Sequence, residues 1–207
     1  MLLQGKYVTL RPLTVDDAEI TQRWRMSGRA FLLNKGAQSV EEQAAWIASR
    51  PFDPTREMNF VMELSPRPSA MPTGAVVPEE LRRVPQPVGM ISLVDIDTTH
   101  RRAEPAHFLI GEPEAVNGLP VAYEACKLIY EFAFDTLGLH RLYGPIASGN
   151  KGMLAFHKYL GFTVEGRQRE HYLLNGERHD AVMIGMLEDE YRTIALPKLN
   201  RLIGVEK

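Results

Sequence analysis

The stretch from Phe108 to Ala122 joins a glycine-containing loop to the start of a helix, an arrangement that can bind phosphate. It has the pattern of a strand end, a loop with Gly111 and Gly118, and a helix beginning near Pro120. Free backbone N–H groups and the positive end of the helix dipole converge at such a point. An ordinary strand-to-helix connection is the alternative interpretation. For a phosphate site, the expected donors are the amides of Gly118, Leu119, Val121 and Ala122.

Other reaction classes lack their characteristic motifs. The chain has no Gly-x-Ser-x-Gly of a hydrolase, no Gly-x-x-x-x-Gly-Lys-Ser/Thr of a nucleotide phosphatase and no His-Glu-x-x-His of a zinc enzyme. The six histidines show no ligand spacing, so no metal site is predicted. The single cysteine, Cys126, falls inside a packed helical stretch and is a poor candidate nucleophile.

The composition is that of an ordinary globular protein, with 207 residues, 44% hydrophobic residues and a formal net charge of -2. The sequence has no broad basic face that would predict nucleic-acid binding and no polybasic patch that would predict membrane binding. The N-terminus lacks a signal-peptide pattern, and no apolar stretch approaches the length of a membrane span. We therefore expect a cytoplasmic protein without nucleic-acid or membrane partners.

Strand and helix signals alternate in a way that predicts an α/β (α+β) fold with one twisted mixed sheet and helices on both faces. The clearest helix runs from Pro120 to Leu137, and Asn175-Gly176 is a strong hairpin signal. Other helices are expected to begin at Thr14, Ser39 and Asn150. The expected strands cover residues 7–11, 59–64, 88–95, 103–110, 140–147, 162–165, 170–174 and 177–187.

A proline-rich segment at residues 65–87 interrupts this pattern. It contains six prolines and no clear period, apart from a short helical stretch near residues 79–82. Such a long irregular segment in a compact domain is usually functional or disordered. It is interpreted as an insertion, with a lid or a dimer arm as the alternative. Otherwise residues 1–207 are predicted to form one domain.

A second stretch, Asn150 to Phe162, has an Asn cap, a short helix and the sequence Leu-Gly-Phe. This pattern resembles a conserved region of the GNAT (GCN5-related N-acetyltransferase) superfamily, and the glycine-containing stretch resembles its acetyl-CoA pyrophosphate motif. Residues 8–13 and 175–183 are similar to the branch of ribosomal-protein and amino-sugar acetyltransferases. The resemblance covers about residues 5–192. It implies a single GNAT-like domain that transfers an acetyl group from acetyl-CoA to a primary amine.

The phosphate loop departs from the family pattern. Family members usually carry Arg or Gln followed by two spaced glycines, or by a Gly and an Ala. Here those places hold Asn117, Pro120 and Ala122, so an Arg side chain and one amide donor are lost. This departure leaves weaker cofactor binding or an inactive member open. A non-catalytic CoA-binding module is therefore the second hypothesis.

The resemblance also implies where the chemistry takes place. GNAT enzymes hold the pantetheine arm against a splayed strand end, here Phe108, Leu109 and Ile110, and the amine attacks the thioester directly. Glu104 is the candidate base because a carboxylate in a partly buried strand can have its pKa raised towards neutrality. A solvent-facing or ion-paired Glu104 is the alternative. His107 is the rival base and also a candidate residue for binding the acceptor substrate.

His157 stands where many family members have a Tyr that serves the leaving thiolate. The resemblance therefore implies that His157 is the acid, acting as an imidazolium. A solvent-facing histidine is the alternative. Asn117, Asn150 and Lys158 are expected to contact the cofactor, although a cap and a solvated helix face explain the latter two equally well.

The segment after the first helix lies where the family places acceptor-binding loops. Arg25, Arg29 and Asn34 could recognise an anionic or hydroxyl-rich acceptor, with ordinary surface arginines as the alternative. The expected acceptor is a small-molecule or sugar amine. A protein N-terminus is the alternative, and a homodimer is left open.

Overall fold

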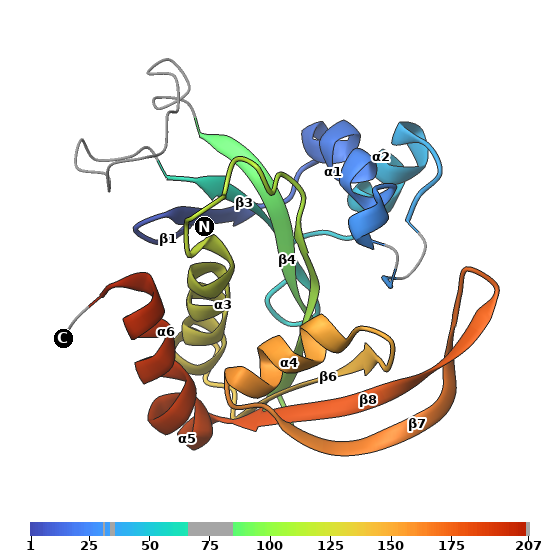
Figure 1. The fold of residues 1–207 in the computed structure, drawn as a ribbon. Helices are drawn as coiled ribbons and strands as arrows, with labels where there is room; N and C mark the ends of the chain where they lie inside the picture. Colours follow the sequence, from blue (N-terminus) through green and yellow to red (C-terminus); the bar gives the residue numbers. More distant parts are fainter. Residues whose placement is uncertain (31, 34–35, 66–84, 206–207) are drawn as a thin grey trace.

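A single mixed sheet runs through the molecule, and helices pack on both of its faces (Figure 1). The computed structural model describes residues 1–30, 32–33, 36–65 and 85–205. Across the sheet, the strand order is β1-β2-β3-β4-β5-β6-β8-β7, and only β5 and β6 are parallel neighbours. The strands are β1 (Leu3–Gln4), β2 (Val8–Pro12), β3 (Met58–Leu64), β4 (Gln86–Asp97), β5 (Arg102–Ile110), β6 (Arg141–Ala147), β7 (Thr163–Leu174) and β8 (Glu177–Leu187).

Short helices connect the strands and close the C-terminal end. The α-helices are α1 (Ala18–Arg25), α2 (Val40–Ala48), α3 (Val121–Glu131), α4 (Lys151–Tyr159), α5 (Glu188–Glu190) and α6 (Leu196–Ile203). Two 3₁₀ turns, η1 (Val15–Asp17) and η2 (Gly28–Ala30), and two π-helical turns, η4 (Phe132–Thr136) and η5 (Tyr191–Ala195), adjoin them. No helix of the described residues is long and apolar enough to cross a membrane.

The two faces of the sheet carry separate apolar clusters. On β4, Ile91 belongs to the main core together with Ile129 of α3 and Leu199 of α6. The neighbouring Met90 instead packs with Trp24 of α1 on the opposite face. This alternation follows the two-residue period of a strand. Helices α1 and α2 therefore cover one face and α3 and α6 the other, which confirms the expected architecture (Figure 1).

The local signals for the caps at Ser39 and Asn150 and for the hairpin are confirmed, whereas Thr14 precedes η1 without a side-chain cap bond. The side chains of Ser39 and Asn150 each accept the backbone N–H of the residue three positions on, at 3.2 Å. Asn175 and Gly176 have φ values of 51° and 85°. A two-residue type I′ turn needs positive φ at both positions, so this turn joins β7 to β8 as predicted.

Several boundaries differ from those expected. β4 begins at Gln86, so Pro87 belongs to the sheet and not to the insertion. Residues 66–84, with the predicted short helix, lie outside the described residues. The two expected strands at 162–165 and 170–174 are one strand, β7, bent at Glu170 where φ is 51°. The long helix begins at Val121, and its last turn, η4, is π-helical.

The sequence analysis did not predict β1 or α6. Helix α6 buries Leu199 and Ile203 in the main core, and Gly204 ends it in the left-handed conformation at φ 69°. It lies beyond the stretch that carries the family resemblance, but its apolar residues have helical spacing. The missed helix therefore had a readable signal.

Glu124 fastens the N-terminal segment to the start of α3. Its side chain is buried, and its carboxylate accepts backbone N–H bonds from Lys6 at 2.8 Å, Tyr7 at 2.6 Å and Val8 at 2.8 Å. Charge-assisted bonds of this kind are stronger than bonds between neutral groups. The contact fixes the entry into β2 beside the first turn of α3.

Candidate active site

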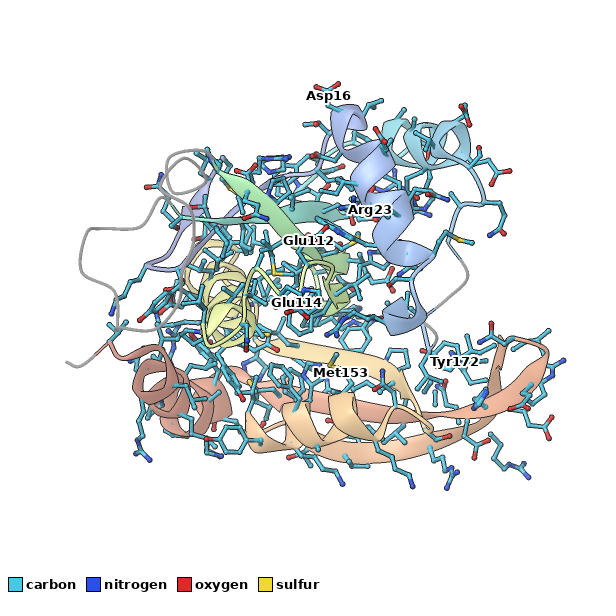
Figure 2. The ribbon with its side chains drawn as sticks, turned by 45° about the horizontal axis from the view of Figure 1, so that its top comes forward. Asp16, Arg23, Glu112, Glu114, Met153 and Tyr172 are labelled. Atoms are coloured by element: carbon cyan, nitrogen blue, oxygen red, sulfur yellow. The ribbon has the colours of Figure 1, made fainter. Side chains whose placement is uncertain are left out.

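A cleft of about 180 Å³ opens where β5 and β6 separate. The two strands pair only through residues 102–103 and 141–142, and beyond these they diverge. Figure 2 labels two of the residues that line the cleft, Met153 on α4 and Tyr172 on β7. The other lining residues are Arg25, Leu32, Leu33, Val94, Glu104, Pro105, Ala106, His107, Phe108, Pro145, Ile146, Ala147, Asn150 and His157.

A β-bulge in β5 forms part of the cleft wall. Met90 faces Leu109 and Ser92 faces Ala106, so β5 has one more residue than β4 across this interval. His107 lies in the extra stretch with φ at 51°, a left-handed value that is uncommon for a residue other than glycine. Bulges leave backbone groups outside the ladder, bend a strand and redirect side chains. The bulge therefore aims this part of β5 at the cleft.

Glu104 lies on the cleft wall in an environment that favours its neutral form. Its side chain lies against β6, where a Cβ added to Gly144 would meet Glu104 Cγ at 3.2 Å. Burial raises the pKa of Glu104 to about 7, and the charge of Asp95 adds to this rise. Within the described part of the chain Glu104 has no ion pair, and Arg102 pairs with Asp97 at 3.5 Å instead. The carboxylate can therefore take up a proton near neutral pH.

His107 lines the same cleft and is held by polar neighbours. Its Nδ1 lies 3.0 Å from Ser92 Oγ and 3.4 Å from Asn59 Oδ1, and its ring meets Trp46 edge to face at 5.8 Å. Burial, and then the charge of Arg25, lower the pKa of His107 to about 4. A neutral histidine that resists protonation is a weaker base than Glu104. His107 still lines the cleft, where an acceptor would lie.

His157 reaches the cleft from α4 but is not charged there. The residue is 8% exposed, and its ring packs edge to face on Phe156 at 5.5 Å and on Phe162 at 4.8 Å. Burial lowers the pKa of His157 to about 4. The expectation of an imidazolium is therefore wrong, and so is the solvent-facing alternative. A neutral imidazole can still donate one N–H bond.

Tyr172 is a cleft residue that the sequence analysis missed. Its hydroxyl donates to the carbonyl oxygen of Pro145 at 3.2 Å. Burial, and then the charge of Glu104, raise the pKa of Tyr172 to about 12, so the hydroxyl keeps its proton. In the sequence it is one of several polar or aromatic residues of a hairpin strand. Only the curvature of the hairpin brings it to the cleft.

Three stacked rings connect the cleft to the N-terminus of α3. Phe108 of β5 stacks on Phe156 of α4 with centroids 5.8 Å apart, and Phe156 stacks on Tyr123 of α3 at 5.5 Å. Phe108 also lines the cleft. Leu109 instead points into the cluster with Trp24, away from the cleft. An extended apolar group could lie along these rings, from the cleft to the N-terminus of α3.

The N-terminus of α3 is open on its loop side. Gly118 has φ at 73°, and no heavy atom of the described residues lies within 4 Å of a Cβ added there. The N–H of Leu119 donates to Val116 O at 2.9 Å, so that amide serves a turn and is not the free donor that was expected. The first-turn amides of Val121 and Ala122 remain, because a helix offers them no internal acceptor. This arrangement fits a phosphate group.

The remaining predicted cofactor residues lie at several places. Asn150 lines the cleft in addition to capping α4, whereas Lys158 is exposed on that helix. Asn117 is exposed beside Gly118. Ile110 packs against the main core. Only Asn150 and Phe108 among the predicted cofactor residues therefore line the cleft itself.

The residues predicted to bind the acceptor do not all line the cleft. Arg25, at the end of α1, lines the cleft. Arg29 is exposed, and its Nε donates to the carbonyl oxygen of Ile110 at 3.2 Å, which ties η2 to the end of β5. Asn34 lies outside the described residues. Arg25 and His107 are thus the two that the structure brings together.

A larger cavity of about 550 Å³ lies between the end of α2 and β4. It is strongly polar, and one of its arginines, Arg50, pairs with Glu57 at 2.8 Å. None of the predicted site residues that the structure describes lines it, so we take the smaller cleft as the candidate active site. The cavity is lined by Ser49, Arg50, Pro51, Asp53, Arg56, Glu57, Asp95 and Ile96.

The single cysteine does not line the cleft. Cys126 is fully buried, and burial raises the pKa of its thiol to about 12. Among the described residues, no group of three or more His, Cys, Asp or Glu side chains could hold a metal ion.

Parallel strands that diverge, an open helix N-terminus after the first of them and a closing hairpin are thus the features that position the cleft. The chain belongs to the GNAT acetyltransferase family, whose domain model matches residues 8–163. It is similar to the spermidine N(1)-acetyltransferase of Escherichia coli K12, with 32% identity over 103 residues. That match covers 50% of this chain and 54% of the relative. The chain thus spans about half the length of this relative.

Longer matches have lower identity. The probable N-acetyltransferase YjcK of Bacillus subtilis is 25% identical over 190 residues, covering 91% of this chain and 98% of the relative. The structure of spermidine N-acetyltransferase from Vibrio cholerae, in complex with CoA and spermine, aligns with a TM-score of 0.71 at 22% identity. It covers 91% of this chain and 100% of that one, and it supports the fold alone.

Proposed function

We propose that this chain is an acetyl-CoA-dependent N-acetyltransferase that acts on a primary amine by direct attack, without a covalent enzyme intermediate. The observation that carries the proposal is the position of Glu104, whose pKa is raised to about 7, in the cleft between the diverging strands. An amine must lose a proton before or during attack, and a base with a pKa near the working pH suits this task. Amine-dependent release of CoA thiol from acetyl-CoA tests the proposal.

Each part of the site has a separate role in this mechanism. Acetyl-CoA, when bound, supplies a thioester carbonyl as the electrophile. The first-turn amides of α3 would hold its pyrophosphate, and the rings of Phe108 and Phe156 would lie along its apolar arm. Glu104 would take the ammonium proton, directly or through water. The neutral ring of His157 would donate a hydrogen bond towards the leaving sulfur, and the second proton that the attacking nitrogen loses would pass to the departing thiolate to give the CoA thiol.

The alternatives predict different measurements. A non-catalytic module would bind CoA but leave acetyl-CoA intact with every amine tested. A protein N-terminal acetyltransferase would turn over peptides and not small amines. The small cleft volume of about 180 Å³ favours a small acceptor, because binding sites for drug-sized ligands occupy ~300–1,000 Å³.

Gly118→Val tests the position of the CoA phosphates. A branched side chain beside the first-turn amides of α3 should obstruct their approach, and we expect CoA to bind at least about tenfold more weakly, roughly 1.4 kcal/mol. Isothermal titration calorimetry measures this. Gly138→Val is the matched control, since Gly138 also has positive φ, 63°, and equally open surroundings. Equal losses in both variants, or none in Gly118→Val, would place the phosphates elsewhere.

His157→Ala tests the role of the neutral imidazole. Because a hydrogen bond to the leaving sulfur matters mainly in the transition state, we expect kcat to fall about tenfold or more while CoA affinity stays the same. In the parent protein, the pH profile of kcat should show no inflection from His157 between pH 5 and pH 8, since the pKa of His157 is lowered to about 4. Stopped-flow thiol release from pH 5 to pH 9 measures this. An unchanged kcat would reduce His157 to a packing residue.

A further inference from the structure

The charges that line the cleft indicate what kind of acceptor fits it. Among its described lining residues, the cation is Arg25 and the carboxylate is Glu104. The two histidines are neutral at pH 7, because burial lowers both of their pKa values to about 4. The described lining of the cleft thus has one positive side chain and one ionisable carboxyl group. A pocket for a polycation would need additional carboxylates.

Arg25 and Glu104 belong to different parts of the cleft. Glu104 and His107 lie three residues apart on β5, which corresponds to roughly 10 Å of strand at about 3.3 Å per residue. Of the charges that act on His107, that of Arg25 is the largest, and those of Glu57 and Arg50 follow. The charge that acts on Glu104 is that of Asp95. Arg25 therefore lies nearer to His107 than to Glu104 in the cleft that all three residues line.

Arg25 is held in place along its stem. A Cβ added to Gly36 would meet Arg25 Cβ at 2.8 Å, so the chain after η2 packs closely over it. Burial lowers the pKa of Arg25, which marks a guanidinium that has lost part of its hydration. A partly dehydrated guanidinium gains most from a carboxylate or phosphate that it can bind with two parallel bonds.

We propose that the acceptor is a small primary amine that also carries an anionic group, with its amine facing Glu104 and its carboxylate or phosphate facing Arg25. This inference rests on the proposed function and narrows its substrate class. Spermidine, the substrate named for the Escherichia coli relative, has cationic groups and no anion, and its second ammonium would face Arg25. Like charges brought together in a site cost several kcal/mol.

A set of amines of equal length tests the proposal. An ω-amino carboxylate, the uncharged alkylamine and the corresponding diamine differ only in the charge opposite the amine. With the parent protein we expect kcat/KM to fall in that order, by about tenfold at each step, roughly 1.4 kcal/mol. Glucosamine 6-phosphate compared with glucosamine distinguishes a phosphate acceptor from a carboxylate acceptor. A diamine turned over best would overturn the inference while leaving the acetyltransferase function in place.

Charge substitutions at Arg25 give the second arm of the test. Arg25→Glu should reverse the order, so that the diamine exceeds the amino carboxylate, whereas Arg25→Lys should keep it. If Arg25→Glu does not fold, Arg25→Gln should lose the advantage of the anionic acceptor. An order that is unchanged in Arg25→Gln or Arg25→Glu contradicts the assignment. Absence of turnover with every amine, despite tight CoA binding, defeats the proposed function and this inference with it.

Discussion

Glu104→Gln is expected to lower kcat for amine acetylation by roughly 10²–10⁴-fold, the usual contribution of a general base. The amide keeps the shape of the side chain but cannot accept the ammonium proton. CoA affinity should stay unchanged, because the phosphates and the apolar arm are held elsewhere. Steady-state thiol release and calorimetry measure the two quantities. An unaltered rate would mean that His107 or a chain of water molecules, and not Glu104, accepts the ammonium proton.

The pH dependence gives the Glu104 assignment a sharper signature. A base must be deprotonated, so kcat/KM should rise with pH through about 7 and level off above it. Asp95→Asn should move this limb to lower pH, because the charge of Asp95 adds to the raised pKa of Glu104. Asn is well suited to the left-handed φ of 49° at this position. A limb that does not move would exclude Glu104 as its origin.

Stability should respond to the same carboxylate in the opposite direction to activity. A carboxyl whose folded-state pKa is raised from 4.5 to about 7 resists ionisation in the folded state. Folding therefore loses stability as pH rises through this interval, since the unfolded chain releases its proton first. Glu104→Gln should raise Tm relative to the parent at pH 8 and change it little at pH 4, as differential scanning fluorimetry would record.

Glu124→Gln should cause the largest loss of stability, about 2–4 kcal/mol, or a Tm lower by roughly 5–15 °C. The carboxylate accepts three backbone N–H groups with two oxygens. A glutamine offers one oxygen, and its NH₂ group would face an N–H donor. Chemical denaturation followed by circular dichroism measures the loss.

Glu131→Gln is the matched control for Glu124→Gln on the same helix. Glu131 pairs with Lys127 one turn earlier at 2.5 Å, on the partly exposed side of α3. Exposed helix pairs of this spacing contribute about 0.3–0.5 kcal/mol. Similar losses in the two variants would contradict the role given to Glu124 in fastening the N-terminus.

Much of the fold was predictable because its signals are local. Apolar residues at helical spacing gave α3, Ser39 and Asn150 capped the helices they were expected to cap, and Asn175-Gly176 gave the hairpin. β4 was predicted too short because Pro87 was taken as part of the insertion, although it pairs with Glu63 near the strand's beginning. A proline can occupy such a position where its missing N–H is not needed.

The site was only partly predictable because its properties depend on contacts between distant segments. Glu104 was proposed as the base from its place in a half-buried strand, and its raised pKa is consistent with that role. The charge on His157 was wrongly predicted, since the rings that bury it cannot be located from a helix sequence alone. Tyr172 was missed because the curvature of the hairpin, which brings it to the cleft, has no local signal.

Transfer of a labelled acetyl group from acetyl-CoA to an amine tests the central claim most directly. Parent protein, deuterated acetyl-CoA and the panel of anionic, neutral and cationic amines would be combined, and the products followed by mass spectrometry. We predict a labelled N-acetyl product with at least one amine, largely absent with Glu104→Gln at equal CoA occupancy. Saturating CoA binding without a labelled product from any amine or peptide would contradict the account.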